Sequence, residues 1–377
     1  MNKFILMIII SLSILAVACG ETETVEVEVV KEVPVEVVKE VEVEVIKEVE
    51  VIKEVEVIKE VVAPAEIKKP LVIYSGRSES LVAPIIAQFS EATGIEVEVK
   101  YGKTGALAAT LLEEGSKTPA DIYFAQDPGG LGSVESMLAP ISDEIVNLTP
   151  DWADSPTNKW VGISGRARVV VYNLDAISDP STQLPDNIYD FIDPKWKGKI
   201  GWAPTNGSFQ AMVTGMRIIW GEEKTKTWLE GIVANEAKVY AKNTPTVEAT
   251  GAGEVEVGFV NHYYLHRFIA ENTESFRARN YMLPSGGPGS IVLVAGAGML
   301  EASDNKDSAE AFLKFMLSGP AQGFFANQTY EYPLVEGVNK SHLLPDLSTL
   351  NTPDIDISDL GDLAATQKLL QETGALP

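Results

Sequence analysis

The sequence predicts an α/β fold of two lobes joined by a hinge. Three observations lead to this prediction. Roughly 300 residues follow Pro70, which is enough chain for two lobes with separate cores. Strand and helix patterns alternate along those residues. Two apolar strand patterns, near residues 165–170 and 290–297, stand where the chain would cross between the lobes.

The chain opens with an export signal. A short basic start is followed by an apolar run that ends in LAVAC, too short for a membrane span. This ending resembles a bacterial lipobox, and Cys19 is the only cysteine, so it cannot form an internal disulfide. We expect residues 1–19 to be a lipoprotein signal and Cys19 to be lipidated. The protein would then lie on the periplasmic or extracellular face of the plasma membrane, held by acyl chains only. An ordinary signal peptide with an incidental cysteine is the alternative.

Residues 20–69 read as a low-complexity tether. Valine and glutamate alternate, and residues 21–66 hold 15 Glu and 5 Lys, a net charge of −10. Such a segment repels itself and extends, so a solvated spacer is expected. With Lys3 adding one positive charge, the −24 of the chain leaves −15 for residues 67–377. This acidity argues against nucleic acid and anionic membrane surfaces as partners.

The first elements of the folded part predict a parallel sheet. Residues 71–74 form a buried strand, and Leu81, Ile85, Ile86 and Phe89 have helical spacing before a glycine cap at Gly94. A strand near 95–101, a helix near 104–115 and a strand at 120–127 follow. This order implies right-handed crossovers, with ligands at the carboxyl ends of the strands.

The second half repeats the alternation. Strand, turn and helix patterns follow residue 165, the strand 290–300 returns to the first sheet, and helices are expected over 308–328 and 362–376. We therefore assign residues 70–165 and 296–340 to lobe 1, and residues 166–295 and 341–377 to lobe 2. The hinged cleft between the lobes is the expected ligand site.

The sequence holds no nucleotide-binding loop, no HExxH zinc motif and no GxSxG nucleophile elbow. With one cysteine and three histidines, nothing in it indicates an enzyme.

Two adjacent tyrosines, Tyr263 and Tyr264, stand out in the stretch GFVNHYYLHRF. In a strand their side chains would face opposite ways, but in a first helical turn both can project into one cleft. Two half-buried structural tyrosines are the ordinary interpretation. The alternative is a ferric site, because a hard, highly charged cation favours anionic oxygen and draws the proton from a weakly acidic phenol.

From about Pro70 onward the chain resembles the periplasmic ferric-ion-binding proteins, the solute receptors of iron ABC transporters. The matching stretches are VIYSGR, EEGSKTPADIYFAQD, ISGRARVVVYN, PKWKGKIGWAPTNGSF, VYAKNTPTV and VNHYYL. The resemblance implies a type II periplasmic-binding-protein fold, with Tyr263 and Tyr264 as Fe(III) ligands. It also implies a synergistic anion, carbonate or phosphate, bound by Asn206, Gly207, Ser208, Asn243 and Asn261.

The chain departs from the family pattern in lobe 1. Several members carry histidine after the first strand, where this chain has Ser78 and Glu79, and many carry glutamate where Gln126 and Asp127 stand. Glu79, Gln126 or Asp127 could supply a metal ligand, and Arg77 could hold the anion. Helix-start and turn-forming roles are the alternatives for Glu79 and Asp127.

Four more residues lie in the same stretches. For His262 and His266 a surface or packing role is expected, and for Arg166 and Arg168 pairing between the lobes, with anion binding second.

The sequence thus favours a lipid-anchored, monomeric receptor that binds Fe(III) with an anion and delivers it to an ABC permease. A receptor for thiamine, a polyamine, a phosphonate or a sulfonate stays open, since fold alone does not fix function. A tethered surface protein for sensing or adhesion is the other alternative.

Overall fold

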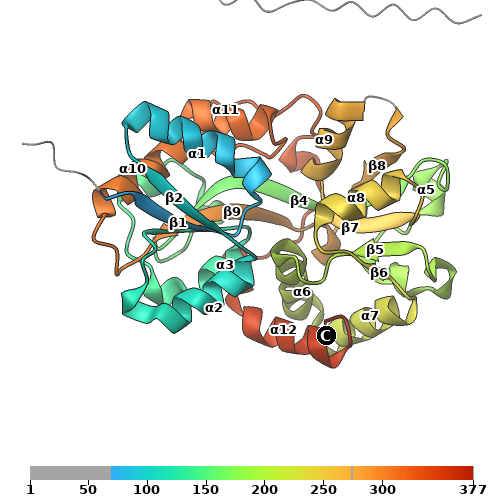
Figure 1. Ribbon diagram of the computed structural model, residues 1–377. Coiled ribbons are helices and arrows are strands. Elements are labelled where there is room, and N and C mark those ends of the chain that lie inside the picture. Colours follow the sequence, from blue (N-terminus) through green and yellow to red (C-terminus); the bar gives the residue numbers. More distant parts are fainter. Residues whose placement is uncertain (1–68, 273–274, 377) are drawn as a thin grey trace, which may run out of the picture. The chain divides into compact units, whose positions relative to one another are not determined.

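A nine-stranded mixed sheet runs through the folded part of the chain (Figure 1). The computed structural model describes residues 69–272 and 275–376. The predicted signal segment, Cys19 and the repeat lie outside the described residues. The strand order is β2-β1-β3-β9-β4-β7-β5-β6, and β8 pairs with β4.

The strands are β1 Leu71–Ser75, β2 Val97–Tyr101, β3 Ile122–Ala125, β4 Val161–Asn173, β5 Ile200–Trp202, β6 Lys238–Val239, β7 Val257–Asn261, β8 Ala278–Tyr281 and β9 Val292–Met299. The helices are α1 Glu79–Thr93, α2 Thr104–Glu114, α3 Pro128–Ser133, α4 Asp143–Val146, α5 Pro180–Gln183, α6 Gly207–Trp220, α7 Glu222–Ala234, α8 Asn243–Gly251, α9 Tyr263–Asn272, α10 Lys306–Met316, α11 Gly319–Asn327 and α12 Leu363–Glu372.

The first group of elements, called lobe 1 below, is built on β1. This strand pairs in parallel with β2 and β3, as the alternation of strands and helices predicts. Successive residues of β3 point to opposite faces. Phe124 therefore lies in a cluster with Phe89 of α1 and Phe312 of α10, while Tyr123 lies in another with Leu107 of α2. Helices thus cover both faces of these strands (Figure 1).

Two long strands connect lobe 1 to the rest. β4 pairs with β9 from Val161 to Ala167 and then with β7 from Arg168 to Tyr172, all antiparallel. The crossing predicted near residues 165–170 lies within β4, and residues 292–297 of the second predicted crossing lie within β9. A backbone that passes from one lobe to the other in continuous strands suits a hinge.

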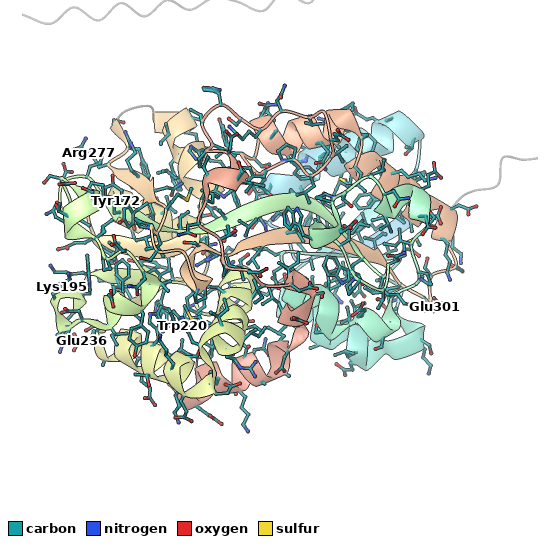
Figure 2. The ribbon with its side chains drawn as sticks, turned by 180° about the vertical axis from the view of Figure 1, so that it is seen from behind. Tyr172, Lys195, Trp220, Glu236, Arg277 and Glu301 are labelled. Atoms are coloured by element: carbon teal, nitrogen blue, oxygen red, sulfur yellow. The ribbon has the colours of Figure 1, made fainter. Side chains whose placement is uncertain are left out.

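The second group, called lobe 2, contains β5 to β8. Phe209 of α6 and Trp228 of α7 pack with Phe259 of β7 on one face, and Val247 of α8 packs with Val260 on the other. Figure 2 shows the molecule from behind. Glu301 of lobe 1 is labelled on one side, and five residues of the lobe 2 half are labelled on the other: Tyr172, Lys195, Trp220, Glu236 and Arg277.

The C-terminal segment contacts both lobes. α12 packs against α6 and α3, and the preceding residues Ile357–Gly361 lie against α3. The lobe boundaries given by the sequence stay a prediction. Within residues 69–272 and 275–376, no helix combines the length and apolar character that crossing a membrane requires.

Candidate functional site

The tyrosine pair lies where β7 gives way to α9. β7 ends at Asn261 and α9 starts at Tyr263, so both tyrosines belong to the first helical turn. Their rings stack with centroids 4.2 Å apart and planes at 28°. Tyr263 is fully buried and Tyr264 is 4% exposed. The Tyr263 hydroxyl has no hydrogen-bond partner among the described residues, an unusual state for a buried polar group.

The environment of Tyr264 opposes spontaneous ionisation. Burial raises the pKa of its phenol well above the usual value, and the neighbouring Tyr263 raises it further. Two nearby guanidiniums, those of Arg77 and Arg166, act in the opposite direction. A metal cation at the phenols would add to their effect and favour the phenolate.

Three buried arginines stand beside the pair. Arg77 follows β1, and Arg166 and Arg168 lie in β4; none of them is more than 1% exposed. Arg166 donates to the Ser208 hydroxyl at 3.3 Å and to the Val294 carbonyl at 2.8 Å. Five further N–H positions have no partner within the described part of the chain: Nε and Nη1 of Arg77, Nε of Arg166, and Nε and Nη2 of Arg168. Unpaired donors at this depth favour an anion.

Arg77 and Arg166 each lower the pKa of a neighbouring arginine. Burial lowers the pKa of Arg166, and the proximity of Arg77 lowers it further. Burial likewise lowers the pKa of Arg168 to about 9, with Arg166 adding to the effect and Tyr264 opposing it. The guanidiniums therefore repel one another at close range.

Glu331 supplies the main counter-charge. It is fully buried and accepts hydrogen bonds from Arg77 Nη2 and from the Ser164 hydroxyl. Burial alone would lower the pKa of Arg77, but Glu331 and the two phenols together raise it above its usual value. The other fully buried carboxylate near Arg166 is Asp127. Three guanidiniums thus face two carboxylates, which leaves one positive charge in excess.

The residues expected to bind the anion gather around α6. Asn206 caps this helix by accepting from the Phe209 amide at 3.3 Å, and Gly207 and Ser208 form its first turn. The Ser208 hydroxyl accepts from Asn261 Nδ2 at 3.2 Å, and Asn261 Oδ1 accepts from Arg168 at 2.9 Å. The N-terminus of a helix carries free amides and positive potential.

Asn243, at the start of α8, has the least satisfied side chain of the set. It is fully buried, and neither Nδ2 nor Oδ1 has a hydrogen-bond partner among the described residues. A buried amide with both ends free is costly unless a ligand completes it.

The lobe 1 candidates lie in different surroundings. Glu79 is exposed at the first turn of α1, next to Ser78 at its N-cap, and Gln126 is 8% exposed. Asp127 is fully buried and caps α3 by accepting from the Gly130 amide at 3.0 Å, while its Oδ2 is unpaired. Burial raises the pKa of the Asp127 carboxyl.

His262 and His266, on either side of the tyrosine pair, lie in largely buried positions. His262 is fully buried; its Nδ1 accepts from the Ala167 amide at 3.1 Å and its Nε2 lies 2.9 Å from the Tyr330 carbonyl. This pairing defines a neutral imidazole with the proton on Nε2. Burial lowers the pKa of His262 to about 3 and that of His266 to about 4. The expected packing role of His262 agrees with these contacts.

A cavity of about 310 Å³ reaches Arg77, Gln126 and Tyr264 from the surface. Residues of both lobes line it, including Glu79, Asn206 and Gly207. A larger cavity of about 490 Å³, lined by Asp151, Trp152, Asp154 and residues 352–357, lies elsewhere. Every buried side-chain polar atom described there has a partner, so the smaller cavity is the functional candidate.

Sequence reasoning missed Glu331 and Ser164. Glu331 stands in the stretch TYEYPL, outside any helical or strand periodicity. A lone carboxylate in such an apolar stretch is a signal for a buried ion pair, but its partner Arg77 lies 254 positions away. For the same reason, the sequence does not show that the buried guanidiniums outnumber the carboxylates around them.

Fold and site together define a two-lobed binding protein with an electropositive cavity between its lobes. Residues 74–323 match the family described as bacterial extracellular solute-binding protein. The chain belongs to this family.

Several relatives of the chain are named as iron-binding proteins. The chain is 31% identical to the major ferric iron-binding protein of Neisseria meningitidis serogroup B over 81% of its own length and 92% of the relative. The iron-bound structure of HitA from Pseudomonas aeruginosa superposes with a TM-score of 0.77 at 30% identity, covering 81% of this chain and 99% of that one. A Trichodesmium protein in complex with iron and citrate ligands gives 0.68 at 28% identity, with 81% and 99% covered.

Proposed function

We propose that this chain captures Fe(III) together with an anion between its lobes and hands the ion to an ABC permease. The observation that carries the proposal is the stacked, buried pair of Tyr263 and Tyr264 beside guanidiniums with unpaired donors. The names of the relatives support the same ion.

The phenols would serve as anionic oxygen ligands. A free tyrosine has a pKa near 10, and burial makes ionisation harder. Ferric ion reverses this preference by binding the phenolate oxygen. Arg77 and Arg166 already favour the ionised form of Tyr264 through their charge, without a hydrogen bond to its hydroxyl among the described residues. The same charges would stabilise both phenolates once iron is bound.

An external anion completes the charge balance. The buried cluster holds one positive charge in excess, and Fe(III) with two phenolates adds another. An anion with two negative charges, such as carbonate or hydrogen phosphate, would neutralise both. The free N–H groups of the arginines and of Asn243, with the N-terminus of α6, are its proposed donors. Glu79, Gln126 and Asp127 are proposed as lobe 1 contributors, and Asn206, Gly207, Ser208 and Asn261 as the frame of the anion site.

The remaining parts of the proposal concern location and partners. We infer a monomer held at the outer face of the plasma membrane through lipid on Cys19, with residues 20–69 as the tether. The protein then works by binding and hinge closure rather than as an enzyme. Its relatives are binding and uptake proteins by name.

A visible absorbance titration tests the ferric site. Residues 67–377 are stripped of metal and titrated with Fe(III) in carbonate, then in phosphate, beside Tyr263→Phe and Tyr264→Phe. We expect a phenolate-to-iron charge-transfer band that each substitution weakens or shifts, while Tyr172→Phe, a change in β4 outside the cavity, preserves it. Absence of the band with both anions would reject phenolate coordination and favour an organic ligand.

A further inference from the structure

A side chain of α6 holds the turn through which the chain enters this helix. Gln210 is 5% exposed, and its Nε2 donates to the Pro204 carbonyl at 3.1 Å. Its backbone amide donates to the Asn206 carbonyl at 3.0 Å, as helical hydrogen bonding requires. Thr205 and Asn206, which follow Pro204, line the cavity together with Gly207. The side chain of Gln210 therefore fixes the part of the cavity wall that leads into the proposed anion site.

Gln210 is itself held by the C-terminal helix. α12 lies beside α6 (Figure 1), and Gln367 Nε2 donates to Gln210 Oε1 at 3.2 Å. An amide has one oxygen that accepts and one nitrogen that donates, so this contact leaves Gln210 Nε2 directed at Pro204. The two side chains, called the glutamine pair below, thus connect α12 to a carbonyl three residues before Gly207.

Lobe 1 approaches the glutamine pair at a residue without a side chain. Gly105 follows Thr104 in the first turn of α2, and Thr104 lines the cavity. A Cβ atom built on Gly105 would lie 2.9 Å from Gln367 Nε2 and 4.0 Å from Gln210 Oε1. The two amides therefore lie where α2 of lobe 1, α6 of lobe 2 and α12 meet.

A neighbouring polar contact joins the same two helices farther from the cavity. The Thr214 and Thr366 hydroxyls are 2.7 Å apart, and Arg217 Nη1 donates to the Thr366 hydroxyl at 3.0 Å. Thr214 stands one turn beyond Gln210 in α6, and neither threonine lines the cavity. α12 therefore has contacts with α6 that do not involve Gln367, so the glutamine pair can be altered while the helix stays docked.

We propose that Gln210 and Gln367 are positioning residues for the anion that accompanies Fe(III). They hold residues 204–208 so that the free amides in the first turn of α6 point at that anion. The inference rests on the proposed ferric function, and neither glutamine lines the cavity. Because a helix N-terminus binds an anion through the direction of its amides, a small rotation of the turn weakens anion binding more than phenolate coordination.

Anion titrations of three single variants test the role of the glutamine pair. Gln210→Met and Gln367→Met remove the two hydrogen bonds with little change in side-chain volume. Thr366→Val removes the neighbouring contact between the same helices and is the matched control. Fe(III)-loaded protein is titrated with phosphate and, separately, with carbonate, and the charge-transfer band gives the half-saturating anion concentration. Iron affinity is then measured at saturating phosphate.

We expect Gln210→Met to need about fivefold more of either anion, as the loss of one ordinary hydrogen bond predicts, and Gln367→Met about threefold more. Both should regain the iron affinity of the wild type at saturating anion, because only the anion is displaced. Thr366→Val should match the wild type in both measurements, whatever its urea midpoint.

Three results would overturn the inference while leaving the ferric site intact. These are unchanged anion concentrations in both glutamine variants, a deficit in iron affinity that persists at saturating anion, and an equal deficit in Thr366→Val. Absence of the band in the wild type with both anions rejects the proposed ferric function itself, and the inference with it.

A change in lobe 1 tests the glutamine pair independently. Gly105→Ala is accepted by the helix but displaces the Gln367 amide, so it should weaken anion binding as Gln367→Met does without lowering the urea midpoint. Gly105→Ala/Gln367→Ala relieves the clash without restoring the amide. Weak anion binding that persists in this double variant supports the proposal. Recovery to the wild-type value would assign the loss to obstructed contact between the lobes and overturn it.

Discussion

The carboxylate of Asp127 in lobe 1 lies against the Cα of Gly207 in lobe 2. A Cβ atom built on Gly207 would come within 2.1 Å of Asp127 Oδ2, closer than any real contact of this kind. Asp127 cannot turn away freely, because it is fully buried and its Oδ1 caps α3. The two lobes therefore meet here only because residue 207 has no side chain.

Gly207→Ala is expected to hold the lobes apart. The added methyl would displace Asp127 or widen the gap between α3 and α6, while the first helical turn tolerates alanine. We expect weaker Fe(III) binding and a larger radius of gyration by small-angle X-ray scattering in the presence of iron. Stability should change little, since the clash arises between lobes.

Gly319→Ala is the matched control for this change. Gly319 also begins a helix, α11, and a Cβ there meets nothing within 4 Å. It should close and bind iron as the wild type does. Restored closure in Gly207→Ala/Asp127→Ala would assign the clash to the carboxylate. An unchanged radius in Gly207→Ala would mean that the side chain of Asp127 yields instead.

Tyr263→Phe should stabilise the metal-free protein while weakening iron binding. The Tyr263 hydroxyl is buried without a partner, and removing such a group recovers about 1 kcal/mol of desolvation cost or more. Tyr332→Phe is the control, because its hydroxyl donates to the Pro345 carbonyl at 3.0 Å. That change should lower the free energy of unfolding by about 1 kcal/mol. Urea unfolding in the presence of a chelator measures both; a loss of stability in Tyr263→Phe would contradict the prediction.

The parts of the fold that the sequence predicts correctly are those with a regular spacing of apolar residues. The buried strand at 71–74 and the apolar spacing of Leu81, Ile85 and Phe89 are local signals, and the parallel pairing of β1 with β2 and β3 follows from them. The tyrosine pair can be singled out from the sequence because two adjacent phenols at the end of a strand pattern are a local signal as well.

The rest of the site depends on contacts that no local pattern carries. Arg77 pairs with Glu331 across 254 positions, and Asp127 meets Gly207 only once the lobes are folded together. Arg166 and Arg168 alternate with apolar residues in β4, a pattern that gives a strand but not its neighbours. Burial of all three guanidiniums beside only two carboxylates is a property of the tertiary structure, so the electropositive site emerged only there.

Glu331→Gln should destabilise the metal-free protein strongly. It leaves the buried Arg77 without its counter-ion, and the one side-chain oxygen that remains replaces two acceptors, those of Arg77 and of the Ser164 hydroxyl. Breaking a buried ion pair on one side costs about 3–5 kcal/mol. The control is Glu301→Gln, which removes an exposed pair with Lys306 and should leave the urea midpoint essentially unchanged. Equal midpoints for the two variants would mean that Ser164 and water replace the lost carboxylate.

Asp154 gives the protein a pH dependence that is independent of the ferric site. It lies outside the tyrosine and arginine cluster, accepts from the Thr149 hydroxyl at 2.6 Å and from the Gly162 amide at 3.0 Å, and is 5% exposed. Burial raises the pKa of its carboxyl from 3.8 to about 6. The folded state therefore keeps a proton that the unfolded chain releases between these values. Stability from this group is present below pH 4 and is lost as the pH rises through 6.

Asp154→Asn should remove this loss. The amide is neutral at every pH, its oxygen can accept from Gly162, and the Thr149 hydroxyl can turn to the Val146 carbonyl, 3.1 Å away. Relative to wild type, the variant should gain about 2.5 kcal/mol in free energy of unfolding between pH 4 and pH 7, since each pKa unit corresponds to about 1.4 kcal/mol and the unfolded carboxyl is already partly ionised at pH 4. Urea unfolding of both metal-free proteins at constant ionic strength gives the two profiles. Parallel profiles would mean that Asp154 titrates alike in the folded and unfolded states.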